Sequence, residues 1–169
     1  MAAGATYEPI ATANLSGVTS YDFSSIPATY TDLRLVVSAR TSAADNLSIR
    51  INSDTGTNYS ELGMMGNGAA ASSWIRSNAT YIRPTNGIGT PTAANTFMIG
   101  TFDFMSYAGS ANKSILITAS NDQNGSGDTV REIGLWRNTV AITAIRVLTN
   151  FAATFQTGTT VTLYGIKAA

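Results

Sequence analysis

The chain has 169 residues, the length of one domain, and its ten Lys and Arg balance ten Asp and Glu, so the formal net charge is zero. Cys and His are both absent, which excludes disulfides, thiol nucleophiles, imidazole bases and the common zinc sites. With only two lysines, no apolar run of about 18 residues and no signal-peptide pattern, the sequence predicts no nucleic-acid partner and no membrane segment.

Apolar and polar residues alternate with a period of two along most of the chain, which predicts β-strands. Strong helix formers are scarce, whereas Thr, Ser, Asn and Gly supply 69 of the 169 residues. In chain order, strands are expected at Tyr7–Ala13, Val18–Phe23, Leu33–Arg40, Leu47–Ile51, Trp74–Arg83, Thr96–Phe104, Ser114–Ala119, Glu132–Trp136, Ile142–Thr149 and Val161–Ile166. Residues 59–73 are rich in Met, Gly and Ala and fit a loop, an edge strand or a short helix.

Short strands separated by Gly, Asn, Asp and Pro indicate an all-β fold. We expect an antiparallel β-sandwich, jelly-roll-like, with about 8–10 strands. Residues 1–12 are expected to form an N-terminal arm or first strand, and residues 13–169 a single β-sandwich domain.

Parity assigns side chains to the two faces of each strand. Phe97 and Ile99 share one parity and Phe102 the other, so Gly100 between them is the expected site of a β-bulge. In the strand expected at Glu132–Trp136, Ile133 is expected to face the core. Trp136 has the opposite parity, so it is expected on the other face of the sheet, as an interface anchor.

The candidate interface residues fall in three segments. They are Tyr7, Pro9 and Ile10 near the N-terminus, Met64, Met65 and Trp74 in the middle, and Trp136 and Arg137 in a later strand. Packing within the sheet is the alternative for each aromatic residue, and a sugar-binding groove is a further one.

The clusters of Asp, Asn and Glu residues predict turns more than metal sites or catalytic sites. The series Asn52, Asp54, Gly56 and Asn58 has alternating oxygen ligands, as in a calcium loop, but position 63 is Gly where an EF-hand needs Glu. The loop at 121–128 offers the same two alternatives. Carboxylate pairs for glycoside hydrolysis are conceivable among Asp22, Asp32, Asp103 and Glu132, but sequence spacing does not bring any two of them together. We therefore predict no catalytic residue, no metal site and no cofactor.

Several segments together resemble a known class of proteins. They are Tyr7-Glu8-Pro9-Ile10-Ala11-Thr12, Phe23-Ser24-Ser25-Ile26-Pro27, Asn52-Ser53-Asp54-Thr55-Gly56, Gly134-Leu135-Trp136-Arg137 and Leu163-Tyr164-Gly165-Ile166-Lys167-Ala168-Ala169. The set is similar to small virion-surface proteins of tailed bacteriophages, notably phages of cyanobacteria. The resemblance implies a jelly-roll-like fold on the phage particle surface, made in the host cytoplasm and assembled as a homotrimer. It brings no catalytic pattern.

The expected function is therefore non-enzymatic. The first hypothesis is a capsid decoration, or cement, protein that binds the major capsid protein or other virion proteins through the 1–12 arm or neighbouring loops. The alternative is a tail-associated or fibre adhesin module that binds host surface polysaccharide. An enzyme such as a glycan hydrolase is the weakest of the three.

Overall fold

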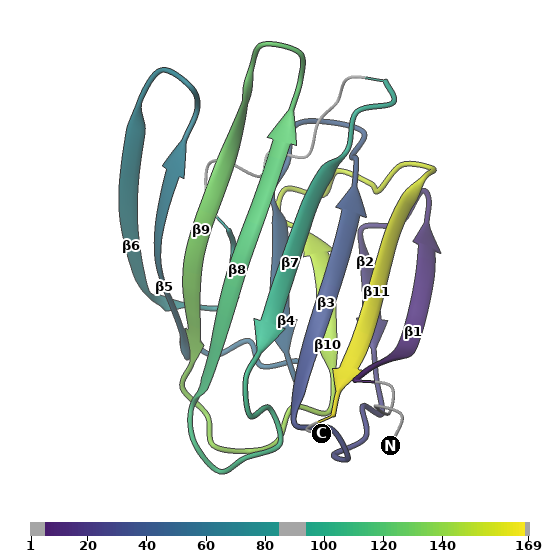
Figure 1. Cartoon of the computed structure of the whole chain (residues 1–169), viewed down its shortest axis with the longest axis vertical. Coiled ribbons are helices and arrows are strands. Elements are labelled where there is room, and N and C mark those ends of the chain that lie inside the picture. Colours follow the sequence, from purple (N-terminus) through teal and green to yellow (C-terminus); the bar gives the residue numbers. More distant parts are fainter. Residues whose placement is uncertain (1–5, 85–93, 168–169) are drawn as a thin grey trace.

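The structure is a computed structural model, and it describes residues 6–84 and 94–167. Within these ranges the chain forms strands and no helix, which confirms the all-β prediction (Figure 1). The eleven strands are β1 (Tyr7–Leu15), β2 (Ser20–Phe23), β3 (Asp32–Ala39), β4 (Leu47–Ile51), β5 (Tyr59–Gly66), β6 (Ala71–Ala79), β7 (Met98–Phe104), β8 (Lys113–Asp122), β9 (Gly127–Trp136), β10 (Ile145–Thr149) and β11 (Thr159–Ile166).

The strands form two antiparallel sheets that pack as a sandwich. The large sheet has eight strands in the order β1-β11-β3-β7-β8-β9-β5-β6, and the small sheet has three in the order β2-β10-β4. Figure 1 shows the small sheet behind the β1–β7 side of the large one. The predicted antiparallel sandwich is therefore confirmed, with eleven strands where about 8–10 were expected.

The order of pairing is that of a jelly roll. The first strand pairs with the last, β2 with β10, and β3 with β7, so each pair is nested inside the one before. The innermost pair is reduced to one antiparallel bridge, between Ile49 of β4 and Ile82. Two hairpins, β5–β6 and β8–β9, are added to this nested set and extend the large sheet beyond the small one.

The core lies between the two sheets, where one parity of each strand is buried. In β3, Leu33, Leu35 and Val37 are fully buried and the residues between them are not, as the sequence predicts. Ile49 of β4 and Val147 of β10 face them from the small sheet, inside the same hydrophobic cluster. Burial of such side chains contributes about 1.5–3 kcal/mol each, which fixes the register of these strands.

Three local predictions differ from the structure. The β3–β7 register is continuous, so Gly100 is not a bulge: it faces the core in step with Phe102, and Ile99 points outward. The strand expected at 74–83 ends at Ala79, and Ile82 crosses to β4 instead. Residues 59–66 and 71–79 form a hairpin: Met64 and Met65 lie on β5, which pairs with β9 on one side and β6 on the other, so most of the Met-rich segment is an inner strand and only residues 71–73 belong to the edge strand β6.

The N-terminal segment is part of the sheet. Tyr7 to Leu15 pair along their length with β11, so residues 7–12 are the first strand and not a free arm. Residues 1–5 of the expected arm lie outside the described residues.

Candidate functional site

The outward face of the large sheet carries one row of side chains across all eight strands. Cross-strand partners connect each member to the next. From the β1 edge to the β6 edge the row reads Pro9, Tyr164, Arg34, Asp103, Leu116, Ile133, Leu62 and Ile75. Its first half is aromatic and charged, and its second half is aliphatic.

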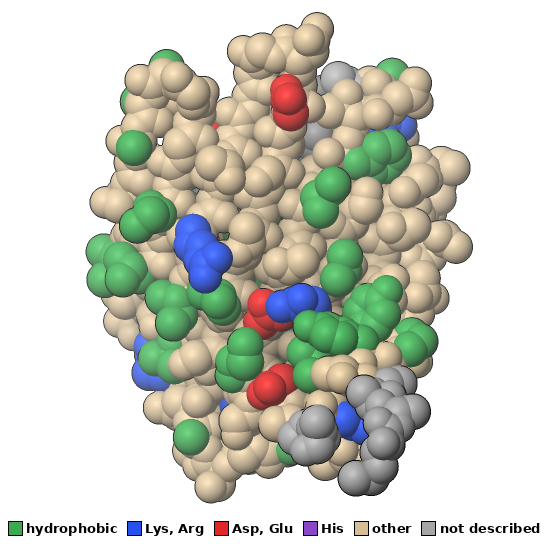
Figure 2. Space-filling model, viewed as in Figure 1, with side chains coloured by type: hydrophobic (Ala, Val, Ile, Leu, Met, Phe, Trp, Pro, Cys, Tyr) green, Lys and Arg blue, Asp and Glu red, His purple; other side chains and the backbone are tan. Residues whose placement is uncertain are grey.

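The aliphatic half is strongly exposed. Ile75 is 79% exposed, Leu62 55% and Ile133 46%, and Met64 beside them is 63% exposed. A shallow hollow between the strands is lined by Leu62, Met64, Ile133 and Leu116, with Arg131 beside it. Figure 2 shows hydrophobic side chains over β5, β6 and β9, and a second group on the β11 and β1 side of the same face. Contiguous exposed apolar surface of this kind marks an interaction site.

The polar half of the row is built around an ion pair. Arg34 on β3 donates from Nε to Asp103 Oδ1 at 2.5 Å and from Nη2 to Oδ2 at 3.0 Å, a two-pronged contact between neighbouring strands. Its guanidinium lies 5.6 Å from the ring of Tyr7, which packs edge-on against Tyr164. Arg34 and Asp103 satisfy each other, so this half offers aromatic edges and little free charge.

The aliphatic half faces outward because the inner face of the added hairpins is occupied by other groups. Glu61 and Gly63 of β5 face inward, and the ring of Trp74 lies directly over Gly63, where a Cβ would come within 2.4 Å of it. On β9, Ile82 covers Gly134 in the same way. With these inward positions filled, the alternating residues Leu62 and Ile133 point to solvent.

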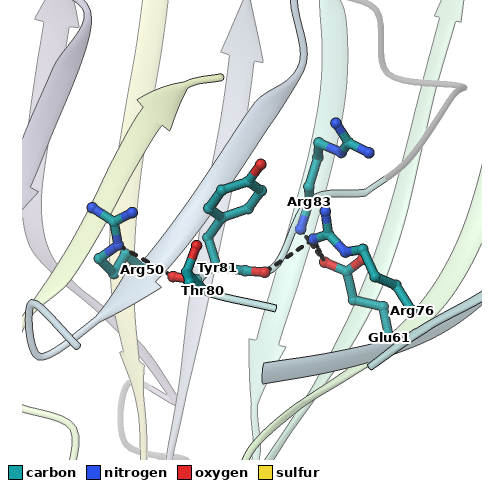
Figure 3. Close-up of polar contacts among 6 residues, drawn as sticks. All are labelled: Arg50, Glu61, Arg76, Thr80, Tyr81 and Arg83. Atoms are coloured by element: carbon teal, nitrogen blue, oxygen red, sulfur yellow. Dashed lines mark hydrogen bonds and ion pairs between the residues drawn. The ribbon is translucent and has the colours of Figure 1, made fainter. Parts of the chain in front are cut away.

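A buried carboxylate anchors the inner side of the β5–β6 hairpin (Figure 3). Glu61 Oε1 accepts a hydrogen bond from Arg76 Nη2 at 2.5 Å and another from the backbone N–H of Arg83. The Arg76 guanidinium also donates to the carbonyl of Tyr81 at 3.0 Å and lies 5.0 Å from its ring. Burial raises the pKa of Glu61 above its ordinary value, although the hydrogen bond from Arg83 and the charge of Arg76 act against the rise. These contacts position the hairpin.

Trp136 is not a surface anchor, and this prediction was wrong. Its side chain is fully buried, stacks on Tyr59 with ring centroids 6.4 Å apart, and donates from Nε1 to Asp54 Oδ2 at 2.7 Å. Trp136 does take the parity opposite to Ile133, as predicted, but the core-facing side of β9 is the one that bears Trp136 and Val130. The prediction placed Ile133 and Leu135 toward the core, whereas in the structure they lie on the outward face of β9.

The other predicted interface residues divide by exposure. Tyr7, Pro9 and Met64 are exposed on the molecule, so their role in an interface stays a prediction. Ile10, Met65 and Trp74 are partly buried and pack against the core, which leaves them little surface for a partner.

Arg137 is held by neighbouring loops. Its Nη2 donates to the carbonyl of Thr57 at 2.6 Å and to Asn78 Oδ1 at 3.1 Å. These bonds connect the end of β9 to the turn before β5 and to the end of β6, which gives Arg137 a structural role.

The Asn52–Asn58 series forms a turn. Asn52 and Ser53 adopt left-handed conformations, and Asp54 accepts hydrogen bonds from the N–H of Gly56 and from Asn58 Nδ2. Burial works against ionisation of Asp54, but hydrogen bonds from Trp136, Asn58 and Gly56 prevail and lower its pKa. Both carboxylate oxygens thus serve the turn and its contact with Trp136.

The carboxylates considered for hydrolysis are engaged in separate structural contacts. Asp22 pairs with Arg146 at 2.7 Å, Asp103 with Arg34, and Asp32 accepts from the N–H of Ser106. Glu132 is buried on the inner face of β9. Across residues 6–84 and 94–167, no three His, Cys, Asp or Glu side chains gather in a way that would hold a metal ion.

Sequence reasoning missed Leu62, Ile75 and Ile133 as surface residues. Their exposure follows from the inward parity of Gly63, Gly134 and Trp136, which is visible in the sequence only after the pairing of the strands is known.

In the described part of the chain, no helix is long and apolar enough to cross a membrane. The chain matches no model of a known protein family, and no curated protein matches its sequence.

Proposed function

We propose that the protein is a non-enzymatic structural component of a tailed-phage particle, and that it decorates the shell by binding the major capsid protein. The observation that carries the proposal is the outward face of the large sheet, where exposed aliphatic side chains lie on a regular, extensively paired scaffold. Such a face is costly in a free monomer and is typical of a protein that works in an assembly.

Two further features support an assembly role. The jelly roll is a fold common in viral coats, although a fold alone does not define a function. The resemblance of the Tyr7–Thr12, Asn52–Gly56 and Gly134–Arg137 segments to virion-surface proteins points the same way. Of the expected 1–12 arm, residues 6–12 lie within the described residues, and Tyr7 and Pro9 are exposed there.

The test is binding to particles that lack the protein. Purified protein is mixed with such particles, unbound protein is removed by sedimentation, and bound copies are labelled with an antibody and seen by negative-stain microscopy. Label over the shell is the expected result. Particles that already carry the protein are the control and should take up no more, and absence of binding to the deficient particles would contradict the proposal.

A tail-associated adhesin that binds host polysaccharide is the second candidate. The feature that favours it is the partly exposed Tyr7–Tyr164 pair, because an aromatic ring combines an apolar face, on which a sugar ring can stack, with a polar hydroxyl group. Label on the tail in the same experiment, together with glycan-array binding that is lost on Tyr7→Ala and kept on Thr12→Ala, would favour this function over decoration.

A further inference from the structure

One cation stands unpaired on the aliphatic half of the outward face. Arg131 of β9 is exposed, and it forms no hydrogen bond or ion pair with any residue in the described ranges. Its cross-strand neighbours are Met64 on β5 and Thr118 on β8. The nearby cations Arg76 and Arg137 are each held by contacts within the molecule. The guanidinium of Arg131 is therefore the charge that this half of the face presents to a partner.

Among the described residues, no carboxylate faces outward beside Arg131. Glu61 and Glu132, the acidic residues of the neighbouring strand segments, point inward and are each 2% exposed. Asp122 does face outward, but it lies four residues along β8 from Thr118, about 13 Å away at the rise of a strand. It also accepts a hydrogen bond from the loop that follows β8. The aliphatic half thus carries one local positive charge and no compensating negative one.

The surface around Arg131 is hollowed along the strands. Leu62 and Ile133 line two adjoining shallow hollows, and Met64 and Arg131 line the second of these together with a third. Because neighbouring hollows share walls, they form one trough along the β5–β9 pair. It follows residues 129–135 of β9, a length of about 20 Å at the rise of a strand. This is room for a short segment of another chain.

The charge decides which occupant fits this trough. A two-fold contact between two copies of the face would desolvate two like charges and supply neither with a carboxylate. A purely apolar partner would bury the guanidinium unpaired, which is costly, and a nucleic acid would need several cations where one is present. A protein segment with Asp or Glu among apolar side chains covers the aliphatic row and also pairs with Arg131. The pairing would resemble the two-pronged contact of Arg34 with Asp103 on the same face.

We propose that the outward face of β5, β6, β8 and β9 binds the major capsid protein, and that it takes an apolar segment of that protein in which a carboxylate pairs with Arg131. The inference rests on the proposed function and deepens it, since it names the contact surface and the chemistry of the partner. The aliphatic side chains exclude water from the ion pair. The pair therefore strengthens the contact and disfavours surfaces that lack a carboxylate.

The first experiment measures the affinity of folded variants, checked by circular dichroism, for particles that lack the protein. Arg131→Gln should weaken binding by at least about tenfold, because the carboxylate of the partner is then buried without its cation. Arg50→Gln is the matched control, since it removes the same charge from the outer face of the small sheet and should bind as the wild type does. Leu62→Ser should also weaken binding by about tenfold. Ile99→Ser should not, although Ile99 is 61% exposed on β7 of the same large sheet.

The outcomes separate this inference from the proposed function. If the wild type binds to the shell and both Arg131→Gln and Leu62→Ser bind equally well, the contact surface proposed above is wrong and the decoration function stands. If the wild type itself does not bind to the shell, both proposals are overturned.

The scarcity of lysine allows a second measurement, which identifies the carboxylate of the partner. Lys113 is buried and Lys167 pairs with Glu8, so few amines compete at the surface. Arg131→Lys places an amine in the trough. A carbodiimide activates a carboxylate, and the amine displaces the reagent as its urea and forms an amide bond. Mass spectrometry of treated particles should find position 131 joined to an Asp or Glu of the capsid protein. Arg50→Lys is the control, and an equal yield of capsid links from both variants would overturn the inference.

Discussion

The large sheet ends in two different ways. At the β1 edge, Pro9 removes a backbone donor, a register shift follows between Pro9 and Ala11, and Glu8 pairs with Lys167 at 2.6 Å. The β6 edge also has a register irregularity and an ion pair with its neighbouring strand, between Arg76 and Glu61, but it contains no Pro and its most exposed residue is Ile75. Natural sheets use Pro, irregularities and charged residues to block strand addition at their edges, so the two edges differ mainly in Pro9, which only the β1 edge has.

The same contrast appears in the row of side chains that joins the two edges. Near β1 the row is closed by contacts within the molecule, between Arg34 and Asp103 and between Tyr7 and Tyr164. Near β6 it consists of aliphatic side chains that face solvent. Substitutions in the two halves should therefore separate the contacts that stabilise the monomer from the surface that is left for a partner.

The largest effect is expected on the inner side of the β6 half. Trp136→Ala should lower the free energy of unfolding by about 3–5 kcal/mol, because it empties a fully buried position and removes one of the hydrogen-bond donors to Asp54. Urea unfolding followed by circular dichroism measures the loss. A change below about 1 kcal/mol, the size usual for a surface site, would contradict the assignment of Trp136 to the core.

Removal of the buried carboxylate should have the next largest effect. Glu61→Ala removes the carboxylate that accepts from the Arg83 N–H and from Arg76, which keeps only the Tyr81 carbonyl, at a cost of about 1–3 kcal/mol. Glu61→Gln retains an acceptor and serves as the control, with a smaller loss expected at neutral pH.

Glu61 also predicts a pH dependence of stability. Its pKa in the folded protein is raised above the ordinary value of 4.5, so its contribution is fully present below pH 4.5 and is lost as the pH rises through the folded value. The free energy of unfolding of the wild type, minus that of Glu61→Gln, should therefore fall as the pH rises through this window. A difference that rises with pH would show that the pKa is lowered instead.

A smaller effect is expected at the polar half of the row. The Arg34 and Asp103 side chains are 35% and 12% exposed, and a pair this accessible contributes about 0.2–1 kcal/mol. A double-mutant cycle with Arg34→Met and Asp103→Asn at low and high salt measures the coupling. We expect the coupling to decrease with salt, and a coupling unaffected by salt would indicate a better shielded pair.

The smallest effect on stability is expected on the aliphatic half of the row. Ile133→Ser should change the free energy of unfolding by no more than about 0.5 kcal/mol, since the side chain is on the surface of the monomer. Thermal unfolding at high dilution, where association is negligible, provides the measurement. A large loss at that dilution would mean that the row stabilises the monomer itself.

The alternation of apolar and polar residues correctly predicts the fold class. It also predicts which side chains are buried in those strands whose apolar residues face the core. β3 and β11 follow it closely, because one face of each lies on the core. β9 does not, because Glu132 and Gly134 occupy the inner face while Ile133 and Leu135 point outward. The rule that apolar residues face the core therefore fails where the inner face is filled by Trp74 and Ile82 from elsewhere in the chain.

The candidate site was only partly predictable for a related reason. Met64 was predicted as an interface residue from the sequence; it is exposed, and its contact with a partner stays a prediction. The alignment of Leu62 with Ile75 and Ile133 depends on which strands are neighbours, and this is set by the added hairpins. Local patterns carry little information about such non-local pairing.

The nested order of the strands has a consequence for how the protein is made. β11, the last strand of the fold, lies between β1 and β3, and Lys167 donates its backbone N–H to the carbonyl of Thr6. β1 has no other neighbour in the sheet, so it has no partner until β11 has left the ribosome. A topology with such distant contacts closes slowly, so the β1–β11 pair is expected to be among the last parts of the sheet to form.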